Sequence, residues 1–242
     1  MTEIYPNSFL AEVLFEVNFE SKKDWDWTIP SEYYNKIKDV FPKKKQEKGL
    51  IFNIENKDKD FYLNQSAAEE TNKLIFINDK DQIFIQITPQ TFTINFLVYK
   101  NWDYFSSEAK KYFDIYKEML SEAKIRDMKL RYINKFEKQS FSSDYSNYFK
   151  IMPKVPIDKR VNKFLIKNEL DYEELNSSLY LTVGNPLSDV NFIVFDFNFM
   201  TTNQKNIEEY NNWLDNAHKS IKSAFESCIT DKAREILNKE VE

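Results

Sequence analysis

The chain has 242 residues, of which 42% are hydrophobic and 30% are charged, and its formal net charge is −5. This length is enough for one large domain or two small ones with a proper core. The negative charge disfavours general nucleic-acid binding, which needs a basic excess to contact phosphates. Only two glycines, one histidine (His218) and one cysteine (Cys228) are present. Glycine-rich phosphate loops and typical zinc sites are therefore excluded.

The sequence carries no mark of export or membrane insertion. No apolar run approaches the ~20 residues of a membrane helix, and residues 1–10 lack the basic-then-apolar pattern of a secretory signal. A single cysteine cannot form an internal disulfide, which fits a reducing compartment. We therefore predict a cytoplasmic protein.

The first predicted element is a strand over residues 8–20, where two kinds of position alternate without a break. Every odd position from Phe9 to Phe19 is apolar, whereas the even positions mix leucines with Glu12 and Glu16. A period of two is typical of a half-buried strand, because successive side chains point to opposite faces. We expect the odd face in a core and the even face either in solvent or lining a cleft.

The next hundred residues predict a short helix, a meander and a long helix. Ser31 is a candidate N-cap for the short helix, with Tyr34, Ile37, Val40 and Phe41 on one face and Pro42 after it. We interpret the basic run at residues 43–48 as a solvated loop. Residues 50–54 and 61–63 are short extended candidates. Residues 73–78, 82–88 and 91–97 alternate with short polar turns, which favours three antiparallel strands.

Asp103 is the candidate cap of a helix over residues 103–122, where apolar residues recur at spacings of three and four. A strand over residues 126–137 follows, and residues 139–156 predict a connection with one helical turn near 145–149. Strands over 161–172, 177–183 and 190–200 then lead to a C-terminal helix with either a kink or a fresh cap at residues 230–231.

This order predicts an α+β fold of antiparallel sheets and long packing helices, in two similar strand-strand-strand-helix halves. The halves are residues 1–140 and 161–242, with residues 141–160 as the connection between them. The alternative is one continuous domain.

Three blocks of the sequence resemble those of a known group of proteins. They are residues 11–21 with Trp27, Pro30 and residues 39–42; residues 130–134; and Trp213, Ala217, His218, Ile221, Phe225 and residues 229–231. Together they resemble a sporadically distributed, uncharacterised prokaryotic protein family. The resemblance implies an accessory gene, including the defence-associated kind, and it transfers no activity, cofactor or catalytic residue.

Five residues are the predicted binding positions: Arg131, Asp196, Glu12, Glu16 and Asn134. Asp196 interrupts an apolar strand, so it should face a partner or a cleft, because burying an unpaired carboxylate is costly. We predict that Arg131 is at least partly buried and bonded to Asp196 or Glu16, the alternative being a solvated sheet face. Glu12 and Glu16 lie about 13 Å apart along one strand, too far to share a metal ion by themselves.

Other candidate residues favour structural roles. His218 is expected to be a hydrogen-bonded structural histidine, and Cys228 a small core residue. The phenylalanines at 192, 195, 197 and 199 could stack bases, but core packing is favoured because no lysine or arginine flanks them.

We therefore expect a non-catalytic protein that binds a protein or small ligand in a cleft between its halves, without cofactor, metal or membrane. The sequence leaves open whether the chain forms a homodimer. The alternative is a Mg²⁺-dependent nuclease or hydrolase using Glu12, Glu16 and Asp196, and a weaker one is an RNA-binding ferredoxin-like protein.

Overall fold

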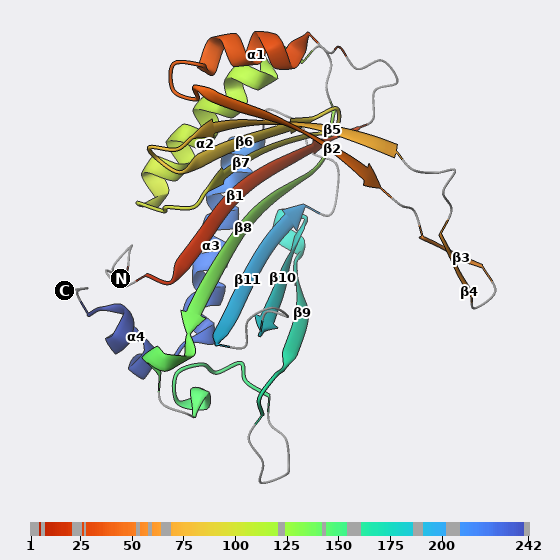
Figure 1. The fold of residues 1–242 in the computed structure, drawn as a ribbon. Coiled ribbons are helices and arrows are strands. Elements are labelled where there is room, and N and C mark those ends of the chain that lie inside the picture. Colours follow the sequence, from red (N-terminus) through yellow and green to blue (C-terminus); the bar gives the residue numbers. More distant parts are fainter. Residues whose placement is uncertain are drawn as a thin grey trace.

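A computed structural model gives the fold (Figure 1). It describes residues 5, 8–20, 26, 28–51, 54–57, 60–63, 69–120, 124–141, 144–153, 161–185, 191–201 and 209–239. At positions 48–51, 54–57, 60–63 and 69–72 only the backbone is described. The predicted α+β class is confirmed, because helices pack on a nine-stranded antiparallel sheet.

The sheet has the strand order β2-β5-β6-β7-β1-β8-β11-β10-β9. Its strands are β1 (Leu10–Phe19), β2 (Lys43–Ile51), β5 (Glu69–Asn78), β6 (Ile83–Thr88), β7 (Thr91–Phe96), β8 (Ile125–Glu137), β9 (Leu165–Tyr172), β10 (Ser177–Gly184) and β11 (Phe192–Thr201). A separate hairpin joins β3 (Ile54–Lys57) to β4 (Asp60–Leu63). The sheet twists so strongly that β9–β11 run steeply across the direction of β2 and β5 (Figure 1).

The strands predicted over residues 8–20 and 126–137 are β1 and β8, which lie side by side in the middle of the sheet. Phe15 of β1 is opposite Leu130 of β8, and Leu130 is opposite Phe199 of β11. All three side chains are fully buried. The alternation that predicts these strands therefore also sets their register, because a one-residue slip would turn every apolar side chain to the other face.

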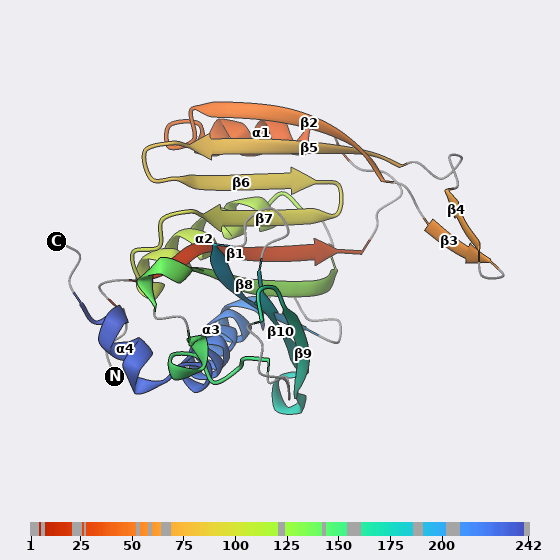
Figure 2. The ribbon, with the colours of Figure 1, turned by 60° about the horizontal axis from the view of Figure 1, so that its bottom comes forward.

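Four helices are described: α1 (Ile29–Ile37), α2 (Trp102–Lys117), α3 (Tyr210–Cys228) and α4 (Asp231–Leu237). Both α1 and α2 lie behind the strands in Figure 2. Phe113 of α2 contacts Phe15 and Tyr210, and Phe225 of α3 contacts Phe197 on β11. One face of the sheet is thus covered by helices. No described helix covers the opposite face, which we call the open face.

Two helix details differ from the prediction. The N-cap of α2 is Asn101, whose Oδ1 accepts a hydrogen bond from the backbone N–H of Tyr104 at 2.7 Å, so Asp103 lies inside the helix. In α1 the buried aromatic residue is Tyr33, and Val40 is 41% exposed. The helix starts at Ile29, before Ser31, because Pro30 occupies its first turn.

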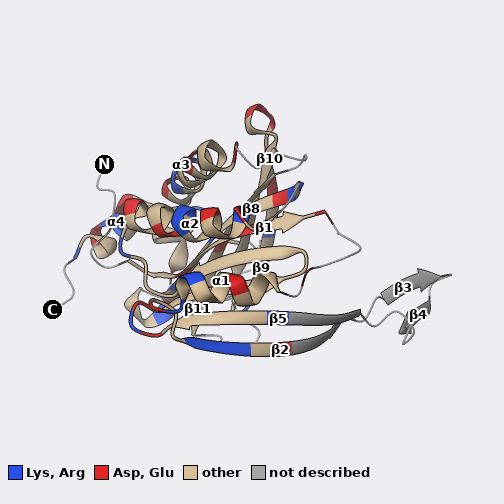
Figure 3. Cartoon of the chain, turned by 90° about the horizontal axis from the view of Figure 1, so that it is seen from above, with Lys and Arg blue, Asp and Glu red and all other residues tan. Residues whose placement is uncertain are grey.

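The basic run at residues 43–48 is part of strand β2, so its prediction as a loop was wrong (Figure 3). Among the described strands, β2 forms one edge of the sheet and pairs only with β5. Lysines suit an edge strand, because their charge discourages pairing with another chain. Two of these lysines also form ion pairs. Lys43 pairs with Asp79, and Lys45 Nζ lies 2.7 Å from Glu47.

The remaining elements follow the predicted order. The helical turn near 145–149 is a 3₁₀ turn at Tyr145–Asn147, and Thr230 caps α4. Pairing of β8 with β11 joins the segments 1–140 and 161–242 in one sheet. In the part of the chain that the structure describes, no helix is long and apolar enough to cross a membrane.

Candidate functional site

Arg131 and Asp196 meet on the open face, as predicted. The Nε and Nη2 atoms of Arg131 donate to the two carboxylate oxygens of Asp196 at 2.8 and 2.7 Å. The side chains are 40% and 21% exposed, so the pair is half-buried. Hydrogen bonding to Asp196 raises the pKa of Arg131 further, and the charges of Glu12 and Glu16 act in the same direction.

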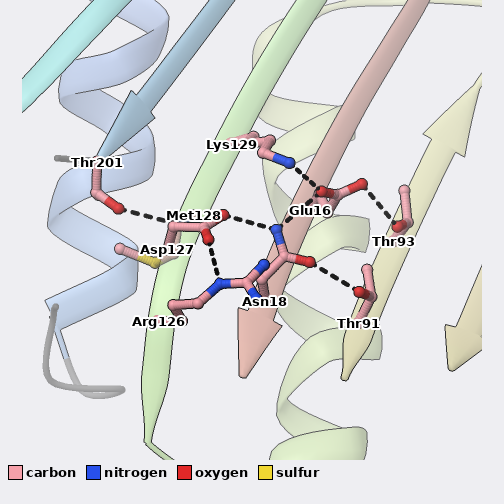
Figure 4. A network of polar contacts seen from close by, with 9 residues as sticks. All are labelled: Glu16, Asn18, Thr91, Thr93, Arg126, Asp127, Met128, Lys129 and Thr201. Atoms are coloured by element: carbon pink, nitrogen blue, oxygen red, sulfur yellow. Dashed lines mark hydrogen bonds and ion pairs between the residues drawn. The ribbon is translucent and has the colours of Figure 1, made fainter. Parts of the chain in front are cut away.

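Glu16 belongs to a second polar network beside this pair, drawn in Figure 4. Lys129 Nζ donates to Glu16 at 2.7 Å, and Asn18 Nδ2 donates to Glu16 at 3.0 Å and to Asp127 at 2.6 Å. Thr91 donates to the Asn18 carbonyl at 2.7 Å. The polar groups of this network thus satisfy one another, which favours a structural role for them. Two other amide oxygens of the open face, Asn95 Oδ1 and Asn198 Oδ1, are buried without a partner among the described residues.

The carboxylates of the open face do not form a metal site. Glu16 is paired with Lys129, and Asp196 is paired with Arg131. Among the described residues, no group of three or more histidine, cysteine, aspartate or glutamate side chains could hold a metal ion. The Mg²⁺-dependent alternative therefore lacks the converging carboxylates that it requires.

Asn134 lies on the other side of the sheet from the remaining four predicted residues. Its side chain lines a pocket of about 80 Å³ between the sheet and α3, which we call the Asn134 pocket. Its other lining residues are Tyr5, Ser8, Phe9, Leu10, Tyr99, Tyr132, His218, Ile221, Lys222, Phe225, Glu226 and Leu237. They come from both segments, 1–140 and 161–242.

His218 forms one wall of the Asn134 pocket. Its ring stacks on Trp102 with centroids 4.0 Å apart, and its Nδ1 lies 2.8 Å from the hydroxyl of Tyr132. Burial, helped by the charge of Lys222, lowers the pKa of His218 to about 4. The ring is therefore neutral at neutral pH, and Nδ1 is the nitrogen that bonds to Tyr132.

Two polar side chains of the pocket, those of Asn134 and Lys222, have no hydrogen-bond or ion-pair partner among the described residues. Asn134 is 7% exposed, and among the described residues its amide has no hydrogen-bond partner. Lys222 forms no ion pair with any described residue. Glu226, in contrast, accepts hydrogen bonds from Tyr5 at 2.6 Å and from Arg234 at 2.9 Å. An amide at a pocket wall without a protein partner is free to bond to water or to a ligand.

The other candidates have structural positions. Phe195, Phe197 and Phe199 are 0% exposed, so they cannot stack on RNA bases. Burial raises the pKa of the Cys228 thiol to about 11, which leaves it protonated and a poor nucleophile at neutral pH.

The sequence indicated Asn134 only by its position on an apolar strand face. It gave no signal for Lys222, because the pocket depends on how α3 crosses β8. Comparisons of the chain with family models, curated proteins and solved structures find no match. The resemblance to an uncharacterised prokaryotic family stays a prediction.

Proposed function

We propose that this protein is a non-catalytic binding protein, and that the Asn134 pocket takes the carboxylate end of a small organic anion with an apolar body. The observation that carries the proposal is the Asn134 amide, which has no hydrogen-bond partner among the described residues and lines a pocket walled by aromatic rings. Ligand pockets commonly combine such apolar walls with a few polar groups that fix orientation.

The charges of the pocket favour an anion. Lys222 supplies a positive charge without a competing carboxylate partner among the described residues. The one carboxylate of the lining, Glu226, is neutralised by Arg234. A carboxylate accepts charge-assisted hydrogen bonds from an ammonium and from an amide N–H, and these are stronger than bonds between neutral groups. His218, being neutral, adds a polar contact without charge.

The size of the pocket limits the ligand. About 80 Å³ accommodates a group of a few non-hydrogen atoms. A carboxylate and the start of its apolar body fit this space, and the rest of the ligand would extend toward solvent. A nucleotide or a large cofactor would not fit inside.

The topology supports a second part of the proposal, that the two segments are duplicated units. In each, a three-strand meander (β5–β7 or β9–β11) is followed by a helix (α2 or α3). The last strand of each meander pairs with a long strand, β1 or β8, and both long strands belong to segment 1–140. The pocket is lined by both segments, which fits the predicted binding site between two halves.

The test uses benzoate and isobutyrate as probes, with benzamide as the uncharged comparison. Binding is followed by NMR at the ring of His218, the only histidine of the chain. We expect both acids to shift this resonance, benzamide to bind more weakly, and Lys222→Met and Asn134→Leu to weaken acid binding by roughly tenfold each. Lys219→Met, an exposed lysine on the same helix, is the matched control. Equal binding in all three variants, or no shift at His218, would refute the proposed function.

A further inference from the structure

Strand β9 is an exposed edge at the opposite end of the sheet from β2 (Figure 1). It pairs with β10, and no described strand pairs with its other side. Leu165 is 63% exposed and Leu170 is 42% exposed. Unlike β2, this edge is not protected by a run of lysines, so it is available for pairing with another strand.

The backbone groups that β9 offers can be assigned. The N–H of Asn185 donates to the carbonyl of Phe164 at 3.2 Å, immediately before the strand. In an antiparallel pair, residues alternate between those bonded to one neighbour and those bonded to the other. Even-numbered residues of β9 therefore bond to β10, and the backbone groups of Leu165, Lys167, Glu169 and Asp171 point outward.

We propose that β9 pairs antiparallel with β9 of a second copy of this chain, around a twofold axis at Asn168. This register places Lys167 opposite Glu169 of the other copy, twice, on the open face. It also places Ile166 opposite Leu170, twice, on the face that the helices cover. Opposite charges and apolar pairs directly across two strands both stabilise a sheet. The outward backbone groups of Lys167 and Glu169 then bond to each other.

The charges on β9 favour this register over the registers whose axis is shifted by one residue. An axis at position 167 would put Lys167 opposite itself, and an axis at position 169 would put Glu169 opposite itself. Like charges directly opposite are destabilising. An axis between two residues would bring outward-pointing residues opposite inward-pointing ones, so the backbone bonds could not form. Position 168 is the axis that pairs opposite charges, brings no like charges together and lets the backbone bonds form.

This inference is independent of the proposed function, because no residue of β9 lines the Asn134 pocket. The dimer would extend the sheet across both copies and remove one exposed edge from each. It is an isologous contact, which closes after two copies and does not lead to fibres.

Sedimentation equilibrium of the full chain tests the pairing by charge reversal. Lys167→Glu and Glu169→Lys each place like charges opposite, so each should raise the dimer dissociation constant by roughly tenfold or more. The double variant exchanges the charges and should restore dimerisation. Lys80→Glu, an exposed turn lysine, is the matched control. A wild-type chain that stays monomeric, or a dimer that no reversal affects, would overturn the proposal.

A disulfide tests the register itself. Residues that face each other at the axis are a non-hydrogen-bonded pair with Cα atoms about 4.5 Å apart, a separation that a disulfide spans. The chain has one other cysteine, Cys228, which is 8% exposed. Asn168→Cys should therefore form a linked dimer under mild oxidation, and Lys80→Cys should not. Equal crosslinking of the two variants would contradict a twofold axis at Asn168.

Discussion

Arg131 shows what a half-buried ion pair contributes on a sheet face that no described helix covers. Its planar fork matches the carboxylate of Asp196 with two parallel hydrogen bonds, a geometry that lysine cannot copy. The guanidinium is still 40% exposed, so water screens part of the attraction. The pair therefore belongs between the weak surface class and the strongly coupled buried class.

We predict that Arg131→Ala lowers the free energy of unfolding by about 1–2 kcal/mol, between the ~0.2–1 kcal/mol of exposed pairs and the ~3–5 kcal/mol of buried ones. Asp196→Asn should cost a similar amount, and the double variant less than the sum, because each single change already removes the contact. Urea midpoints measure all three. Arg126→Ala, which removes a more exposed arginine, is the control and should cost less. Strictly additive losses would show that the pair contributes nothing.

This contact was predictable from the sequence because it rests on strand alternation alone. An acid and an arginine on apolar strands must find partners, and a shared sheet face supplies them. The position of Asn134 was not predictable in the same way. It lies on the apolar face of β8, and the pocket beside it exists only because α3 leaves a gap there. No local sequence pattern predicts such a gap.

His218 gives the protein a distinct pH dependence. The unfolded chain binds a proton at this residue near pH 6.5, whereas the folded chain binds one only near pH 4. Stability from the neutral ring is therefore present above pH 6.5 and is lost as the pH falls toward 4. We predict a loss of roughly 1–3 kcal/mol over this range that His218→Gln does not show. NMR titration of the histidine checks the cause, and a midpoint near 6.5 in the folded protein would disprove it.

At the scale of single elements, strands were easier to predict than helix ends. The three strands of the first meander and strand β8 lie within a few residues of their predicted bounds. Alternation over six or more residues leaves little freedom. The cap of α2 differs because Asn101 and Asp103 are both good capping residues, and the extended backbone at Asn101 decides between them.

Strand β2 shows why one local rule was misleading. A run of lysines predicts a solvated loop when the strand that pairs with it is unknown. Its pairing with β5 makes it an edge strand, where one side of the backbone stays in solvent. The charge was interpreted correctly, but the backbone was not, because edge strands and loops are both solvated. Tertiary pairing therefore decided the structure of this segment.

At the scale of the whole molecule, continuity of the sheet decides how the two segments unfold. The central strands β1 and β8 pair along nearly their full length, and β8 continues this pairing to β11. Rings from both segments also pack together, as where Phe113 meets Tyr210. Two units that share a core and a sheet cannot separate without exposing both, so they should unfold together.

We predict that Ile85→Ala in β6 and Leu181→Ala in β10 each destabilise both segments equally. Both residues are buried, at 0% and 3% exposure, and each truncation should cost about 2–5 kcal/mol. Native-state hydrogen exchange with mass spectrometry measures β6 and β10 in each variant. If unfolding is global, the slowest amides of both strands lose protection by the same amount, wherever the cavity lies. Lys80→Ala, an exposed change, should leave both strands unaffected. Loss confined to the strand that carries the substitution would show two units that unfold separately, despite the shared sheet.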